Sequence, residues 1–240
     1  MTQIDQKYLP KHIAITMDGN GRWAKSKGKI RMFGHNHAIE AVRDTVEAAA
    51  EIGIEFLTLY AFSTENWRRP KTEVNALMNL LVSAINKETK TLMKNNIQLN
   101  TIGDTNSLPD KAKKELLAAI ERTKNNTRMT LTLALSYSGR WDIVNATKNM
   151  LLENISPSII NEDLFEQYLT TNNVPDPELL IRTSGEYRIS NFLLWQIAYS
   201  ELFFTETLWP DFRRNNLEDA ILDYQKRERR FGRTTEQLED

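Results

Sequence analysis

Three absences set the first limits on what this chain can be. None of its 240 residues is cysteine, which excludes disulfide bonds and thiolate metal sites. Its formal net charge is −1, so no global basic field indicates nucleic acid as a partner. The longest strongly apolar stretch, "NFLLWQIAY", is too short to span a bilayer and contains a glutamine. We therefore expect a soluble protein, and because 40% of the residues are hydrophobic, we expect it to have a sizeable core.

The amino-terminal stretch, "MTQIDQKYLPKH", also lacks the apolar core of a signal peptide. Together with the absence of cysteine, this predicts a cytoplasmic location. A peripheral association with the inner face of the membrane stays open, because a soluble protein can still touch a lipid surface.

What the chain does have is a regular alternation of strand and helix patterns, with no linker, repeat or low-complexity segment. This alternation is typical of an α/β fold with a mostly parallel sheet flanked by helices. We predict a single domain, 1–240, with six strands, an N-terminal tail at 1–11 and a C-terminal helix and tail at 216–240. Strands are expected at 12–17, 55–62, 97–103, 128–137, 178–185 and 201–206, and helices at 38–52, 72–95, 110–124, 140–154, 162–169, 191–198 and 216–231.

Several helix boundaries carry local signals. Gly53 predicts the end of the first helix, and Pro109 precedes the start of another. Thr72, Asn161 and Ser190 can each cap the helix that follows them.

Glycine, tryptophan and arginine gather in the loops that follow the strands. These loops read "DGNGRW", "STENWRR", "SGRWD" and "RTSGEYRIS". In open α/β sheets, ligands bind at the carboxyl ends of the strands. The sequence therefore predicts that the functional site lies where these loops meet.

Two familiar sites fit the first loop only formally. "GNGRWA" matches the dinucleotide fingerprint, but the second strand ends in Phe62 and Ser63, without the acid that would hold a ribose. An aspartyl-phosphate phosphatase would place its nucleophile two residues before Asp18, where Thr16 stands.

A diphosphate site fits better. Asp18 can ligate Mg²⁺ bridging to a diphosphate, and glycines let backbone N–H groups approach phosphate oxygens. Arg182 and Arg188 bracket a Ser-Gly turn, and arginine forks suit diphosphate. Glu201 could be a second carboxylate for the metal, although alone it is more typical of a solvated residue.

Each of these residues could also have an ordinary structural role. Asp18 could be only a turn cap, and His35 could cap a helix as well as contact a phosphate. Trp67 and Trp141 could be ordinary packing residues. The apolar face of the helix at 74–93 is that of plain packing on a sheet, and a lipid tunnel would have the same composition.

Five segments together resemble the cis-prenyltransferases, a family that includes the bacterial undecaprenyl diphosphate synthases. They are "HIAITMDGNGRWA", "LTLYAFSTENWRRP", "SGRWDI", "IRTSGEYRISNFLLWQIAYSELFF" and "LWPDF", in order between about residues 12 and 233. The aspartate-rich D-D-x-x-D helices of trans-prenyl synthases are absent. The resemblance implies a homodimeric, Mg²⁺-dependent transferase that extends farnesyl diphosphate with isopentenyl diphosphate, making the polyprenyl carrier lipid for cell-wall sugars.

The resemblance also implies roles for residues at matching positions. Asp18 falls on the catalytic and metal-binding aspartate, Glu201 on the second metal ligand, and Asn66 on the proposed proton-acceptor region. Contacts to the allylic substrate are implied for Gly19, Asn20, Gly21, Arg22, Trp23, Arg31, His35, Ser63, Trp67 and Arg69. Contacts to isopentenyl diphosphate are implied for Arg182, Arg188 and Ser190.

Two further expectations follow from the resemblance. "Arg230-Phe231-Gly232" looks like the family's R-x-G element, which implies that Arg230 contributes to the site of a partner subunit. Release of the product at a membrane surface is also expected. Two other functions stay open: a Mg²⁺-dependent phosphatase, and a non-catalytic partner subunit, which would be expected to lose residues such as Asp18.

Overall fold

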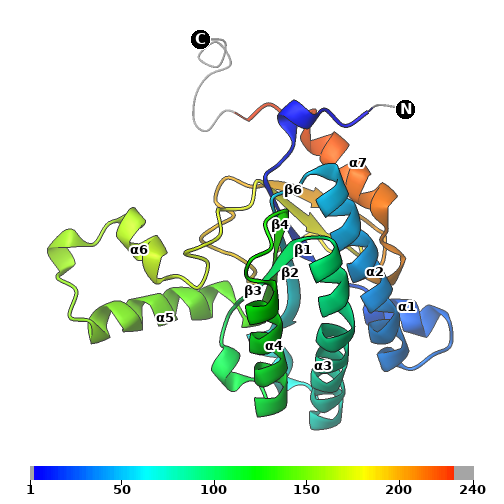
Figure 1. The fold of residues 1–240 in the computed structure, drawn as a ribbon, viewed down its shortest axis with the longest axis horizontal. Helices are drawn as coiled ribbons and strands as arrows, with labels where there is room; N and C mark the ends of the chain where they lie inside the picture. Colours follow the sequence, from blue (N-terminus) through cyan, green and yellow to red (C-terminus); the bar gives the residue numbers. More distant parts are fainter. Residues whose placement is uncertain (1–2, 230–240) are drawn as a thin grey trace.

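The computed structural model describes residues 3–229 and shows one sheet of six parallel strands in the order β3-β4-β2-β1-β5-β6. Helices α2, α3 and α4 stand side by side in front of the sheet, whereas α5 and α6 form an arm that projects from it (Figure 1). The strands are β1 (His12–Thr16), β2 (Phe56–Ser63), β3 (Ile97–Ile102), β4 (Met129–Tyr137), β5 (Leu179–Arg182) and β6 (Glu201–Phe204), and the helices are α1 (Asn20–Ser26), α2 (Arg31–Ile52), α3 (Lys71–Lys94), α4 (Asp110–Thr123), α5 (Gly139–Leu152), α6 (Glu162–Tyr168) and α7 (Arg214–Tyr224).

The sheet separates two apolar clusters. The larger cluster joins Ile15, Leu59 and Leu131 to the helices α2, α3, α4 and α7. The smaller cluster, on the other side of the alternating strand pattern, includes Ala14 and Phe192. All five residues of β1 are buried, as expected of a central parallel strand. The predicted α/β fold with a six-stranded sheet is thus confirmed, and the sheet is parallel throughout.

Most predicted elements lie where the sequence placed them, but several boundaries differ. Gly53 ends α2 in the left-handed conformation, and the Asn161 side chain caps α6, both as predicted. The first predicted helix begins at Arg31 rather than residue 38, and α1 before it was not predicted. The backbone turns into α3 at Pro70, so Thr72 is not its cap. The last helix covers only Arg214–Tyr224.

The helix predicted at 191–198 is wrong. Ser190, Asn191 and Leu193 have φ values of 50°, 62° and 49°, which a right-handed helix excludes. Asn191 instead serves the start of α5, because its carbonyl accepts the Gly139 N–H and its side chain accepts the Arg140 N–H. The segment therefore forms turns that cap another helix while Phe192 enters the smaller cluster.

Within residues 3–229, no helix has the length and apolar character needed to cross a membrane.

Candidate active site

A cavity of about 680 Å³ opens at the carboxyl edge of the sheet. This size is within the range of about 300–1,000 Å³ that is typical of small-molecule sites. One end is polar and formed by the loops after β1, β2 and β5, whereas the other end is apolar and formed by α2, α3 and the strands beneath them. The polar side chains that line it include Thr16, Asp18, Asn20, Arg31, His35, Tyr60, Ser63, Glu65, Asn66, Arg69, Arg182, Arg188, Ser190 and Asn191.

Asp18 is fixed by its backbone, which leaves its carboxylate in the cavity. Its N–H donates to Thr183 Oγ1 at 2.8 Å, and its carbonyl accepts the Trp209 N–H at 2.9 Å. Its Oδ1 accepts the N–H of Gly19 at 2.6 Å. Gly19 has a φ of 106°, and a Cβ there would lie 2.8 Å from Leu208 Cδ2, so the turn after Asp18 requires glycine.

The second carboxylate oxygen of Asp18 meets a buried arginine. Arg182 Nη2 lies 3.0 Å from Asp18 Oδ2, and the Arg182 side chain is only 3% exposed. Its Nη1 donates to the carbonyl of Arg188 at 2.6 Å and to Ser190 Oγ at 2.7 Å. Burial lowers the pKa of Arg182 and the Asp18 carboxylate opposes that shift, but a guanidinium stays protonated. The structure thus brings Arg182 into contact with Asp18, and places Arg188 and Ser190 against Arg182.

Arg22 links two loops instead of lining the cavity. It donates to the carbonyl of Ser184 at 2.9 Å and to Ser184 Oγ at 2.5 Å. Glu186 is 3.2 Å from Arg22 and also pairs with Arg188. Arg22 therefore holds the loop after β1 against the loop after β5, with Asp18 Oδ2 at 3.7 Å.

A second arginine pair lies where α2 and α3 begin: Arg31 is the first residue of α2, and Arg69 directly precedes the cap of α3. Arg69 and Arg31 approach the same oxygen of Glu73, at 3.2 Å and 3.6 Å. His35 lies near these two arginines. Its pKa is lowered to about 4, mainly because the ring is buried and also because Arg69 and Arg31 carry positive charge. His35 is therefore neutral near neutral pH. Its Nε2 is buried and has no hydrogen-bond partner among residues 3–229, so a ligand oxygen would satisfy it.

The loop after β2 forms a short 3-10 turn, and the side chain of Asn66 caps the start of that turn. Asn66 Oδ1 accepts the N–H of Ser63 at 3.1 Å, and the Ser63 side chain accepts the backbone N–H of Asn66, which completes a capping box. Trp67 does not line the cavity. Its Nε1 donates to Ser136 Oγ at 2.9 Å and its ring packs edge-on against Phe62, which is the packing interpretation.

Two predicted site residues lie elsewhere in the fold. Trp23 is 7% exposed and stacks on Phe33 with Lys27 above its ring, so it braces α1 against α2 instead of walling the cavity. Glu201 begins β6 and lies level with Leu179, three positions before Arg182.

Glu201 is therefore not brought to Asp18 within one chain. Since a parallel strand rises about 3.3 Å per residue, three positions place Glu201 about 10 Å back along the sheet from Arg182. There its carboxylate pairs with Arg227 at 2.8 Å. The pairing of these two carboxylates on one metal therefore stays a prediction that the position of Glu201 within one chain does not support, because matching motifs carry no information on strand register.

The residues around Asp18 still fit a Mg²⁺ ion whose ligands come partly from the protein and partly from the substrate and water. Among residues 3–229, no group of three or more His, Cys, Asp or Glu could hold a metal ion. Mg²⁺ often uses only one or two carboxylates and completes its shell with water and substrate phosphates. The Asp18 side chain is 37% exposed and lines the cavity, which suits this mode. A protein cage for the metal is not what this site offers.

The structure adds residues that the sequence interpretation missed. Glu65 and Asn191 both line the cavity and join its two sides, because Asn191 Nδ2 donates to Glu65 Oε1 at 2.8 Å. Tyr60 also lines it and donates to the carbonyl of Tyr137 at 3.0 Å. Glu65 lies in one of the loops predicted to form the site, whereas Asn191 lies in the segment 191–198, for which the sequence predicts a helix.

The chain is similar to a family model and to several known proteins over nearly its whole length. A family model described as putative undecaprenyl diphosphate synthase matches residues 16–232. The chain is 57% identical over 234 residues to the isoprenyl transferase of Chlorobaculum tepidum, covering 96% of this chain and 88% of the relative. It is 51% identical over 236 residues to the ditrans,polycis-undecaprenyl-diphosphate synthase ((2E,6E)-farnesyl-diphosphate specific) of Pasteurella multocida, covering 97% and 98%.

Two solved structures share the fold over nearly the whole chain. Lavandulyl diphosphate synthase from Lavandula x intermedia, in complex with dimethylallyl diphosphate, gives a TM-score of 0.91 at 37% identity and covers 94% of this chain and 99% of that one. A probable undecaprenyl diphosphate synthase from Campylobacter jejuni gives 0.79 at 33% identity, with coverage of 93% and 99%.

Proposed function

The chain belongs to the undecaprenyl diphosphate synthase family, and from this premise we propose that it condenses isopentenyl diphosphate onto farnesyl diphosphate. The product is a long-chain polyprenyl diphosphate, undecaprenyl diphosphate, the carrier lipid for cell-wall sugars. The chain is a prenyltransferase, and neither the phosphatase nor the non-catalytic subunit is favoured. Thr16 stands where the phosphatase needs its nucleophile, and Asp18, Arg182 and Arg188 are all present and meet at the cavity.

One observation carries this proposal: the polar and apolar ends belong to one cavity. Asp18 and four arginines line the same space as Val42, Leu77, Leu81 and Ala84. A phosphoester of a small polar molecule would not need the apolar end. A diphosphate with a hydrocarbon body needs both.

Two groups of arginines support a division between the two substrates. We assign the allylic diphosphate to Arg31 and Arg69, next to Asn20, Gly21 and neutral His35. Isopentenyl diphosphate goes to Arg182, Arg188 and Ser190. Each arginine pairs with a carboxylate in this structure, and diphosphate oxygens would take over these charge-assisted bonds.

The chemistry then follows from positioning and charge. The double bond of isopentenyl diphosphate supplies the electron pair for a new bond to C1 of the allylic substrate. The allylic C–O bond breaks, its electron pair leaves with the diphosphate, and a proton is lost from C2 of the isopentenyl unit. Mg²⁺ bound at Asp18 would supply charge neutralisation at the departing diphosphate.

The proton acceptor is assigned to that departing diphosphate. A neutral amide is a weak base, and Asn66 Oδ1 already accepts the Ser63 N–H. Asn66 therefore acts in this proposal by fixing the loop that carries Ser63 and Arg69. Arg31 and Arg69 keep the leaving group in place while it takes the proton.

The test is product analysis of the purified chain with Mg²⁺, farnesyl diphosphate and labelled isopentenyl diphosphate. We expect a polyprenyl diphosphate whose mass increases by whole isoprene units. Release of inorganic phosphate without any chain growth would support the phosphatase instead.

We also propose that residues 1–240 act as one catalytic domain within a homodimer. The arm formed by α5 and α6 exposes apolar side chains, including Leu151, Leu152 and Ile159 at 70%, 78% and 57%. Such exposed side chains support an interface between copies.

Arg230 lies outside the described residues, so its action in a partner's site stays a prediction. Product release at the membrane surface follows from the apolar product.

A further inference from the structure

A second, smaller cavity continues the apolar end of the first. Its volume is about 140 Å³ and it lies between α2 and α3, above β2, β3 and β4. Its apolar lining includes Val46, Ile85 and Leu131. The two cavities share the lining residues Met17, Ile39, Val42, Ala61, Leu81 and Ala84, so they form one path away from Asp18.

The lining of this second cavity is mainly apolar, but it also includes Glu47, two threonines and one ion pair between the helices. Arg43 on α2 meets Glu88 on α3 through two parallel contacts, Nε to Oε2 at 2.8 Å and Nη2 to Oε1. The Arg43 and Glu88 side chains are 33% and 15% exposed, so both are partly withdrawn from water. We call this pair the clasp. It is bidentate and joins the two helices across the second cavity.

The second cavity is small for the hydrocarbon chain of a polyprenyl product. An apolar cavity of about 150 Å³ accommodates a molecule the size of benzene. A chain that grows by several isoprene units can enter only if α2 and α3 separate. The clasp opposes that separation, because parting the pair would leave a partly buried guanidinium and carboxylate against hydrocarbon.

We propose that the Arg43–Glu88 clasp is a specificity-determining element that limits how far α2 and α3 part, and so limits the length of the product. This inference rests on the proposed function and deepens it. The growing end of the chain advances along the apolar path until further growth requires the clasp to break. The length at which growth slows is then set at the clasp, far from the diphosphate residues.

The test compares product masses from the wild-type chain and from two single variants, Glu88→Gln and Arg43→Met. Each variant keeps a side chain of similar length and removes one charge. We expect products longer by one or more isoprene units, with an initial rate of isopentenyl incorporation within about twofold of wild type, since neither residue touches the diphosphates. Arg43→Met is needed because Glu40 and Glu47 also act on Arg43 electrostatically and could hold it after Glu88 is changed.

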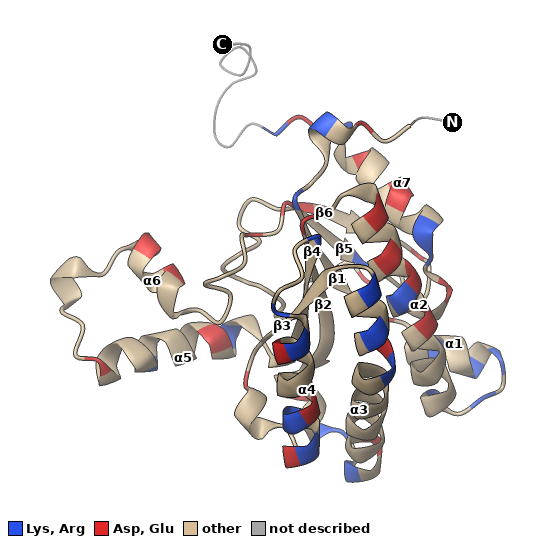
Figure 2. Ribbon diagram, in the orientation of Figure 1, with Lys and Arg blue, Asp and Glu red and all other residues tan. Residues whose placement is uncertain are grey.

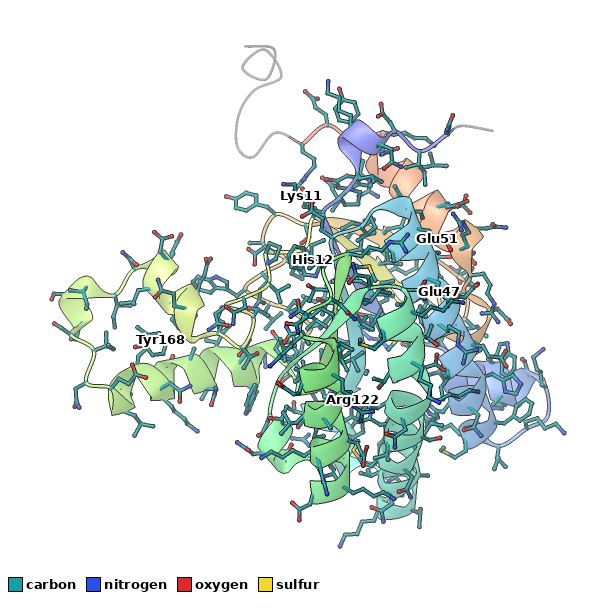
Figure 3. The ribbon with its side chains drawn as sticks, in the orientation of Figure 1. Lys11, His12, Glu47, Glu51, Arg122 and Tyr168 are labelled. Atoms are coloured by element: carbon teal, nitrogen blue, oxygen red, sulfur yellow. The ribbon has the colours of Figure 1, made fainter. Side chains whose placement is uncertain are left out.

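Two controls separate the clasp from a general loosening of α2. Glu51 lies on the same helix (Figure 3) and pairs with Arg214 of α7, but it lines neither cavity. Glu51→Gln should leave product length unchanged. The exchange variant, Arg43→Glu with Glu88→Arg, re-forms the pair in reverse and should return the product length toward wild type.

Unchanged product lengths in both single variants would overturn the clasp, as would an equal lengthening in Glu51→Gln. A lengthening that persists in a folded exchange variant would also overturn it, because the pair and not its members is proposed to act. If a single variant fails to fold, as thermal melting would show, the other variant and the exchange variant decide. A wild-type chain that makes no polyprenyl product would instead sink the proposed function, and this inference with it.

Discussion

The two ends of the main cavity are built in different ways. The polar end is formed mainly by loops that follow strands, and its side chains pair with one another across those loops: Asp18 with Arg182, and Glu65 with Asn191. The apolar end is formed by the faces of α2 and α3, whose exposed sides carry charges of both signs (Figure 2). In the proposed reaction, the first end acts through the charges of its side chains. At the second, function depends on the shape of the space between the helices.

The largest effect that would test this contrast is expected at Asp18. Asp18→Asn keeps the size and the acceptor for the Gly19 N–H but removes the charge. We expect kcat to fall by about 10²–10³-fold, or about 3–4 kcal/mol, the scale seen when one group that stabilises transition-state charge is removed. Steady-state kinetics in saturating Mg²⁺ would measure this loss.

Asp104 provides the matched control. It follows β3 at the same edge of the sheet, but within residues 3–229 its carboxylate accepts only the Asn106 N–H, in a turn, and it does not line the cavity. Asp104→Asn should keep near-normal kcat. If the Asp18 variant were as active as the Asp104 variant, the polar end would not be the catalytic end.

A change of pH should affect stability through the opposite edge of the sheet. His12 begins β1 (Figure 3) and is 2% exposed, with its ring nitrogens 2.5 Å from the Pro175 carbonyl and 2.7 Å from Thr58 Oγ1. Burial lowers its pKa from 6.5 to about 4. The unfolded chain therefore binds a proton more readily, so the stabilisation is present above about pH 6.5 and is lost as the pH falls toward 4.

The expected loss over that window is about 3 kcal/mol, at about 1.4 kcal/mol for each pKa unit, and His35 adds to it in the same direction. Urea unfolding at a series of pH values would measure it. In His12→Gln the pH dependence should be shallower while both Michaelis constants stay unchanged. An equally steep dependence in that variant would show that His12 is not responsible.

A crossed pair of substitutions would sharpen the division within the polar end. Arg188→Ala should raise the Michaelis constant for isopentenyl diphosphate, and Arg31→Ala that for farnesyl diphosphate, each by about 10–100-fold. Both side chains are more than half exposed, so the fold should survive, and each lost charged hydrogen bond is worth about 1.5–3 kcal/mol. Kinetics with one substrate varied and the other saturating would decide. The reverse pattern would mean that the two subsites are exchanged.

The smallest effect is expected at Glu73, which holds Arg31 and Arg69 in this structure. Glu73→Gln removes the competing carboxylate, so the Michaelis constant for farnesyl diphosphate should fall by about two- to fivefold, the scale of a partly exposed ion pair. A rise would indicate that Glu73 instead orients the two arginines for the substrate. The sign of the change is therefore the informative quantity.

The polar end could largely be predicted from the sequence because its residues follow strands in short loops. Asp18, Arg182, Arg188 and Ser190 all meet as the motifs indicated. Glu201 shows the limit: its motif is intact, but strand register, which no local pattern reveals, places it away from Asp18. Trp23 shows another limit, since its ring stacks on Phe33 and does not line the cavity.

The apolar end could not be predicted, although most of its helices and strands were. Leu81 and Ile85 have the spacing of ordinary core residues on α3, and only the distance between α2 and α3 makes them line a cavity. The segment after Ser190 failed for a related reason. Its apolar residues match a helix period, but Asn191 is bound to the start of α5, a tertiary contact that overrides local preference.

The most direct test of the central claim, that both ends form one site, is a crystal structure with the thiolo analogue of farnesyl diphosphate, which resists cleavage. We predict its diphosphate within hydrogen-bond distance of Arg31 and Arg69 beside Asp18, with the farnesyl chain running past Val42 and Leu81 toward the clasp. A diphosphate bound only at Arg182 and Arg188, with the hydrocarbon outside the space between α2 and α3, would contradict the account.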